Sequence, residues 1–70
     1  MTPQERKRIE FRLIQNEQEL AGIDKMIDIF ENDGKSVAVS MRYRRAVVGR
    51  MSRLYRYVLA QDELQMRLPL

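Results

Sequence analysis

Few residues of this 70-residue chain have the types and spacing that catalysis or ligand binding requires. Gly34-Lys35-Ser36 matches the end of a phosphate-binding P-loop, but that loop needs a second glycine where the chain has Ile29. Residues 31–34 match part of a calcium-binding loop. Its first and last ligand positions would fall on Ile29 and Ser40, which carry no carboxylate. Neither motif is complete, so neither predicts a site.

The chain also lacks histidine and cysteine, the residues that most often serve as general base, nucleophile or zinc ligand. Two carboxylate pairs, Glu17 with Glu19 and Asp62 with Glu63, fall on polar faces of expected helices. Solvation explains such faces better than acid–base chemistry. We therefore predict a protein that is not an enzyme and that has no cofactor and no metal site.

Arginines and tyrosines in the second half are the most distinctive surface feature. No lysine follows Lys35, so the basic charge rests on arginine, which makes directional bonds to carboxylates and phosphates. Arginine and tyrosine are also enriched at the hot spots of protein interfaces. Helical spacing places four arginines on one outward stripe, with two tyrosines beside it. We predict that these six residues bind a partner: Arg42, Tyr43, Arg45, Arg53, Arg56 and Tyr57.

Three interpretations of this arginine stripe remain open. The stripe can bind an acidic surface of a host protein, bind the phosphates of RNA or DNA, or be a solvated face neutralised by the first helix. The enrichment in arginine and tyrosine favours the protein partner. Neither helix-turn-helix spacing nor an RNA-binding motif supports the nucleic acid, which is the second choice.

The first element is expected to be a long helix over residues 3–33. Thr2 is a suitable N-cap, Pro3 suits the first helical position, and Glu5 completes a capping box. Gly34 supplies left-handed geometry at the other end. Apolar residues recur every three or four positions, which predicts a seam against another helix: Ile9, Leu13, Asn16, Leu20, Ile23, Ile27 and Phe30.

Two residues of this helix do not fit a simple apolar seam. Asn16 either lies at the edge of the seam or pairs with a second asparagine across a dimer axis. Gly22 costs about 1 kcal/mol relative to alanine. We expect it to mark the close approach of another helix, the alternative being a weak position.

A connection over residues 34–40 is expected to lead into a second helix over about 40–65, followed by a tail at 66–70. Ser36 and Ser40 are the candidate N-caps, and Pro69 ends the helix. Alternation over residues 37–44 is also compatible with a strand that pairs between molecules. The second helix is expected to have a broad apolar face made of Val47, Val48, Met51, Leu54, Tyr55 and Val58. Four of these residues are expected to complete the seam: Val47, Met51, Leu54 and Val58.

Charge predicts how the two helices are arranged. Residues 1–34 carry five basic and eight acidic side chains, and residues 35–70 carry eight and two. An antiparallel hairpin would place the acidic Asp24, Asp28 and Glu31 near Arg42, Arg44 and Arg45. It would also place the basic Arg6, Arg8 and Arg12 near Asp62 and Glu63. The predicted fold is therefore an all-α, antiparallel two-helix hairpin forming one domain.

A domain of this size without disulfides needs another source of stability, so we expect a homodimer that forms a four-helix bundle. The absence of cysteine favours the cytoplasm. The sequence contains no apolar run long enough to cross a membrane, and its first residues do not form a signal peptide.

The chain resembles the small phage-encoded helical hairpins of the quorum-sensing anti-activator type. The resemblance rests on length, the Thr2-Pro3-Gln4-Glu5 start, two long helices, and the arginine- and tyrosine-rich segments 42–45 and 53–57. It implies a dimer that captures the DNA-binding part of a LuxR-type regulator, and also a pilus-assembly ATPase. The RNA-binding hairpins of plasmid copy control have a similar architecture. Neither resemblance transfers a site residue.

Overall fold

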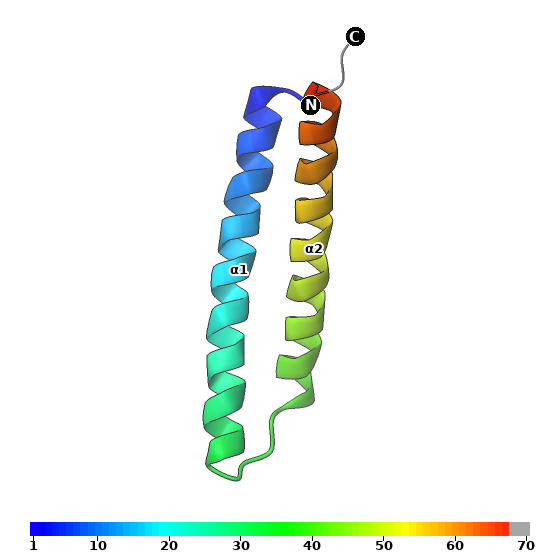
Figure 1. The fold of residues 1–70 in the computed structure, drawn as a ribbon. Coiled ribbons are helices and arrows are strands. Elements are labelled where there is room, and N and C mark those ends of the chain that lie inside the picture. Colours follow the sequence, from blue (N-terminus) through cyan, green and yellow to red (C-terminus); the bar gives the residue numbers. More distant parts are fainter. Residues whose placement is uncertain (68–70) are drawn as a thin grey trace.

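The computed structural model describes residues 1–67 and contains two helices, α1 (Pro3–Asn32) and α2 (Val39–Arg67). They run antiparallel along their whole length, so the N-terminus lies beside the end of α2 (Figure 1). The predicted all-α hairpin is confirmed, and the molecule measures 57 × 18 × 17 Å. Within the described range, neither helix is long and apolar enough to span a bilayer. The predicted helix end at Pro69 and the part of the predicted tail beyond Arg67 fall outside the described residues.

Both ends of α1 follow the predicted capping signals. The Thr2 side chain accepts a hydrogen bond from the Glu5 amide at 3.2 Å, and Pro3 begins the helix. At the other end, Gly34 has a φ of 71°. Its amide bonds to the carbonyl of Glu31 at 3.1 Å, and the Lys35 amide bonds to that of Phe30 at 2.8 Å. These two bonds form a Schellman motif, which only a residue tolerating positive φ can complete easily.

Residues 37–44, whose alternating pattern also allowed a strand, contain no strand in the structure. Residues 35–38 have no regular structure, and α2 begins at Val39. The predicted serine caps are wrong, because the residue before the helix is Ala38 and Ser40 already lies inside it. The Ala38 carbonyl accepts bonds from the amides of Met41 and Arg42 at 3.1 and 3.2 Å. Alternation failed as a signal here because residues 1–67 contain no second extended segment that could pair with this one.

The seven predicted α1 seam positions, from Ile9 to Phe30, are all partly buried against α2. The contacting row of α2 differs from the prediction. Val48, at 3% exposure, is the only buried apolar residue of the described part of the chain. The row continues at helical spacing through Ser52, Tyr55, Leu59 and Asp62.

The predicted α2 row (Val47, Met51, Leu54 and Val58) lies beside this seam. Leu54 is 51% exposed, so its placement in the core of a single hairpin is wrong. The other three are partly buried, and the role of all four in a dimer stays a prediction. The two rows differ by one residue in register. The buried row contains a serine and an aspartate, so hydrophobicity alone favoured its more apolar neighbour.

Candidate protein-binding surface

One flank of the hairpin is lined by carboxylates spaced seven residues apart on α1. We call this set, which is Glu10, Glu17, Asp24 and Glu31, the acidic row. A spacing of seven keeps the four side chains on one face of the helix. Each of them accepts a hydrogen bond from an arginine, as the following two paragraphs describe.

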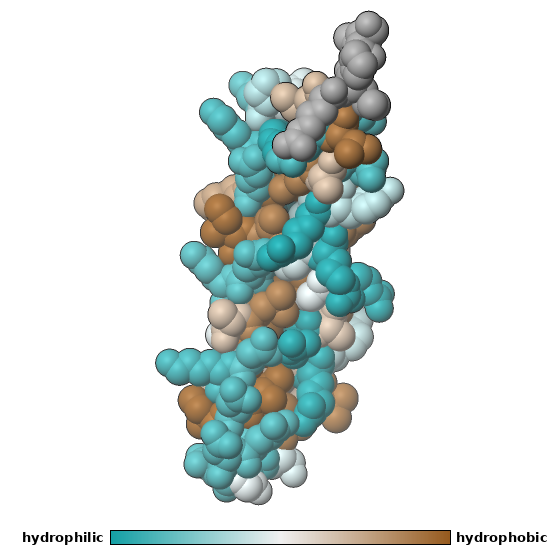
Figure 2. All heavy atoms as spheres, viewed as in Figure 1, coloured by the Kyte–Doolittle hydropathy of each residue, from teal (hydrophilic) through white to brown (hydrophobic). Residues whose placement is uncertain are grey.

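Three of these arginines come from α2 and bridge the two helices. Arg45 donates to both oxygens of Asp24, and Arg56 donates to Glu17. Arg42 donates to Glu31 at 3.1 Å near the connection. The exposed arginines therefore cross the seam, which agrees with the hydrophilic side chains that interrupt the apolar surface in Figure 2. Such pairs stabilise weakly in water, yet their order along the flank specifies the antiparallel register.

Arg6 makes the most enclosed ion pair between two side chains, at the open end of the hairpin, where the N-terminal amine of Met1 also lies 3.9 Å from Asp62. Its guanidinium donates to Asp62 at 2.7 Å, to Glu63 at 2.9 Å and to Glu10 of the acidic row at 2.9 Å. Asp62 is buried, so Arg6 supplies the charge that this carboxylate needs. The hydrogen bond to Asp62 raises the pKa of Arg6, against a smaller opposing effect of desolvation. A raised arginine pKa means that this stabilisation is present at neutral pH and is lost only in strong alkali.

The opposite flank of the hairpin has one interhelical ion pair. Arg44 donates to Glu19 at 2.7 Å, and this hydrogen bond raises the pKa of Arg44. The α2 residues that share its face are the apolar ones predicted for the seam, Val47, Met51, Leu54 and Val58. On α1, the residues four, seven and eleven positions after Glu19 are Ile23, Met26 and Phe30. We call these seven residues the apolar flank.

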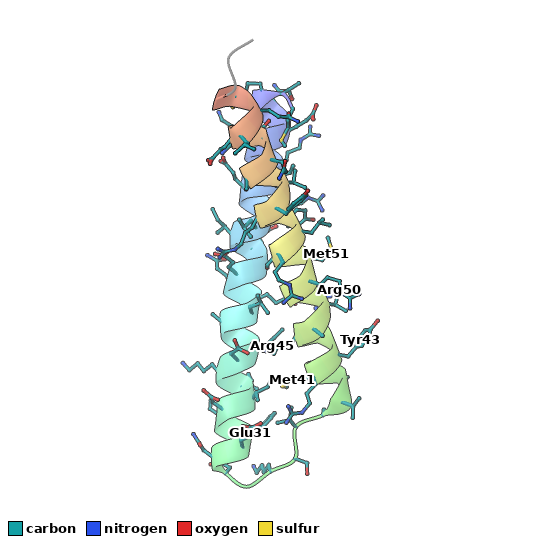
Figure 3. All side chains as sticks on the ribbon, turned by 45° about the vertical axis from the view of Figure 1, so that its right-hand side comes forward. Glu31, Met41, Tyr43, Arg45, Arg50 and Met51 are labelled. Carbon is teal, nitrogen blue, oxygen red and sulfur yellow. The ribbon has the colours of Figure 1, made fainter. Side chains whose placement is uncertain are left out.

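A third surface, the outer face of α2, points away from α1. Tyr43, Arg50, Tyr57 and Leu64 recur there every seven residues, and Arg53 lies beside them. Tyr43 is 71% exposed and Tyr57 is 62% exposed. Tyr43 projects away from α1, whereas Arg45 and Met41 extend towards it (Figure 3). Arg50 and Arg53 form no ion pair with any residue that the structure describes.

The six predicted partner-binding residues are therefore divided between two surfaces. Arg42, Arg45 and Arg56 belong to the ion-paired flank, whereas Tyr43, Arg53 and Tyr57 lie on the outer face of α2. The prediction missed Arg50 and Leu64, which the seven-residue repeat starting at Tyr43 would have identified. It also missed the acidic row, which the same spacing starting at Glu10 would have identified.

The ion pairs observed at the open and closed ends of the hairpin agree only in part with those predicted from the charge pattern. The pairs Arg42–Glu31, Arg45–Asp24, Arg6–Asp62 and Arg6–Glu63 are confirmed. Arg44 lies on the other flank and bonds Glu19. Within residues 1–67, no ion pair forms at Arg8, Arg12, Asp28 or Asp33.

The described residues offer no enclosed small-molecule site. Two hollows of about 220 and 250 Å³ adjoin Asp62 at the open end of the hairpin. Both are smaller than the about 300 Å³ at which ligand pockets begin. Between Met1 and Arg67, no three acidic side chains are grouped so that they could hold a metal ion.

Comparisons with family models, with curated proteins and with solved structures found no match to this chain. The resemblance to anti-activator hairpins stays a prediction.

Proposed function

We propose that this protein is a regulator that forms a homodimer and inhibits or modulates a host protein by stoichiometric capture, without catalysis. The observation that carries the proposal is the outer face of α2. Two exposed tyrosines lie there along one side of a single helix, together with two arginines that form no ion pair within residues 1–67. We place this activity in the cytoplasm. In line with the resemblance, we regard a transcriptional regulator as a candidate target.

The chemistry of the outer face suits an acidic protein surface. Tyr43 and Tyr57 offer large, stiff and amphipathic contact area at low entropic cost. Arg50 and Arg53 lie between them and offer planar donors that match carboxylates. Because nothing in the described part of the chain neutralises these two guanidinium groups, a partner's carboxylates would be their first strong acceptors.

The acidic row argues against nucleic acid as the main partner. Arg42, Arg45 and Arg56 each bond a carboxylate of α1, so phosphates would have to displace these acids and then lie beside them. Adjacent like charges oppose phosphate binding. On the outer face of α2, Arg50 and Arg53 form no ion pair within residues 1–67, and Tyr43 and Tyr57 lie on either side of them.

A pull-down from host lysate tests this proposal, with and without nuclease. We expect the tagged wild-type chain to retain one protein at stoichiometric level in both conditions. The variant Arg50→Glu/Arg53→Glu should lose it while keeping its helicity. The matched control Lys7→Glu/Lys25→Glu makes the same charge change at exposed positions of α1 and should retain the protein. Recovery of nucleic acid alone, or full retention by the arginine variant, would contradict the proposal.

A further inference from the structure

The single hairpin leaves nearly all of its apolar side chains partly or largely exposed to water. Val48 is the only apolar side chain buried within residues 1–67, and its neighbours in the α2 row include the polar Ser52 and Asp62. Small domains of this kind rely on disulfides, a metal or oligomerisation for stability. The chain has no cysteine for disulfides. A second protein surface is therefore the available source of further burial.

The apolar flank has the pattern of a second helix-packing seam. Its α2 residues, Val47, Met51, Leu54 and Val58, follow the i, i+4, i+7, i+11 spacing of coiled-coil contacts. Leu54 and Met26 are exposed in the single chain. The one ion pair that crosses this flank, Arg44–Glu19, is internally neutral, so it does not repel an apolar neighbour.

We infer that a second copy of this chain covers the apolar flank and that the two copies are related by a two-fold axis perpendicular to the helices. This inference rests on the homodimer in the proposed function and assigns a surface to it. The flank extends over residues 23–30 of α1 and 47–58 of α2, which is about 17 Å along the longer of the two segments.

Unpaired charges at the two ends of α1 set the orientation. Arg8 and Arg12 near its start form no ion pair with the described residues, and neither does Asp33 near its end. Arg12 is seven residues before Glu19 and Asp33 is seven after Met26, so both lie on the side of the apolar flank. A two-fold axis perpendicular to the helices places the start of α1 in one copy at the level of its end in the other. Each basic end then faces an acidic end, whereas a parallel arrangement would set like charges together.

Sedimentation equilibrium at micromolar concentration tests the inference. We expect the wild-type chain to have twice its 8.4 kDa mass. Met51→Glu/Leu54→Glu should weaken the dimer by more than about tenfold, because it buries carboxylates in the interface. The control Phe11→Glu/Ile14→Glu changes exposed apolar residues on the side of α1 away from the apolar flank and should stay dimeric. A monomeric wild type, a dimeric flank variant or a monomeric control would overturn the assignment.

A second pair of variants keeps the test valid if the flank variant does not fold. Arg8→Glu/Arg12→Glu alters only exposed charges and should weaken the dimer about tenfold at low salt. Adding Asp33→Arg should restore part of the lost affinity, because the new arginine then faces the introduced glutamates. Failure of this rescue would overturn the antiparallel orientation. The pull-down distinguishes this inference from the proposed function. If the monomeric variant Met51→Glu/Leu54→Glu still captures the partner, the outer face of α2 binds the partner without the dimer.

Discussion

The Arg45 guanidinium donates to both carboxylate oxygens of Asp24, which lies on the other helix, with Nη2 and Oδ2 3.4 Å apart. Related bridges join Arg56 to Glu17 and Arg42 to Glu31. Arg42, Arg45 and Arg56, which the sequence pattern assigned to partner binding, therefore align the two helices of the hairpin. The outer face of α2, with Arg50 and Arg53, is left to act on other molecules.

Removing the acidic row should increase affinity for polyanions. The variant Glu17→Gln/Asp24→Asn/Glu31→Gln frees three arginines and raises the net charge by three. We expect it to elute from heparin at clearly higher salt than the wild type, because more cations can meet sulfates or phosphates.

A matched control makes the same change in charge elsewhere. Glu5→Gln/Asp28→Asn/Asp33→Asn alters three acids that form no ion pair within residues 1–67. It should shift elution less. Identical elution of the two variants would show that net charge matters and that the pairing of the acidic row does not.

Alanine at either of two helical glycines should stabilise the fold by about 1 kcal/mol, as helix propensity requires. A Cβ at Gly49 would lie 3.9 Å from Leu20 Cδ2, an ordinary contact. A Cβ at Gly22 would meet nothing within 4 Å, so the close approach predicted there is wrong for a single chain. Urea unfolding measures both effects. Destabilisation by Gly22→Ala would instead indicate that another molecule packs against that position.

The Ser52 hydroxyl is buried and forms no hydrogen bond. An unsatisfied buried hydroxyl costs about 1–3 kcal/mol, so Ser52→Ala should leave stability unchanged or raise it by about 1 kcal/mol. Thermal unfolding followed by circular dichroism measures the change. A loss of more than about 1 kcal/mol would mean that the hydroxyl has a partner that the single chain lacks.

A carboxylate in the seam should abolish folding. Leu20 lies in the middle of the α1 seam, within 4 Å of where a Cβ at Gly49 would be. Leu20→Asp would place an unpaired charge between the helices, at a cost of several kcal/mol that exceeds the stability of so small a domain. Circular dichroism should show loss of the helical signal. Phe11→Asp, at an exposed position, is the control and should fold.

The α1 helix could be predicted almost completely, because its seam is apolar at every position but Asn16 and both its ends carry capping residues. The α2 seam could not, because tertiary contacts decide it. Asp62 is buried where Arg6 and the N-terminal amine reach it from the start of the chain, and Ser52 lies in the row although it is polar. Hydrophobic patterning selected the neighbouring row instead, one residue out of register.

The candidate binding surface was predicted only in part, because tertiary contacts decide this surface as well. Composition identified the arginines and tyrosines of α2, but it could not show which arginines a second helix would neutralise. Arg56 and Arg53 are three residues apart, yet only Arg56 reaches a carboxylate of α1. The seven-residue repeats starting at Glu10 and at Tyr43 contain that information once the helices are known to be antiparallel.

Native mass spectrometry of the captured complex tests the central claim most directly, namely that the outer face of α2 binds a partner while the apolar flank binds a second copy. We predict a complex that contains two copies of this chain together with its partner. We also predict that Met51→Glu/Leu54→Glu yields a complex with one copy and the same partner. A wild-type complex with a single copy would contradict the claim, because the partner would then have displaced the second copy from a shared surface.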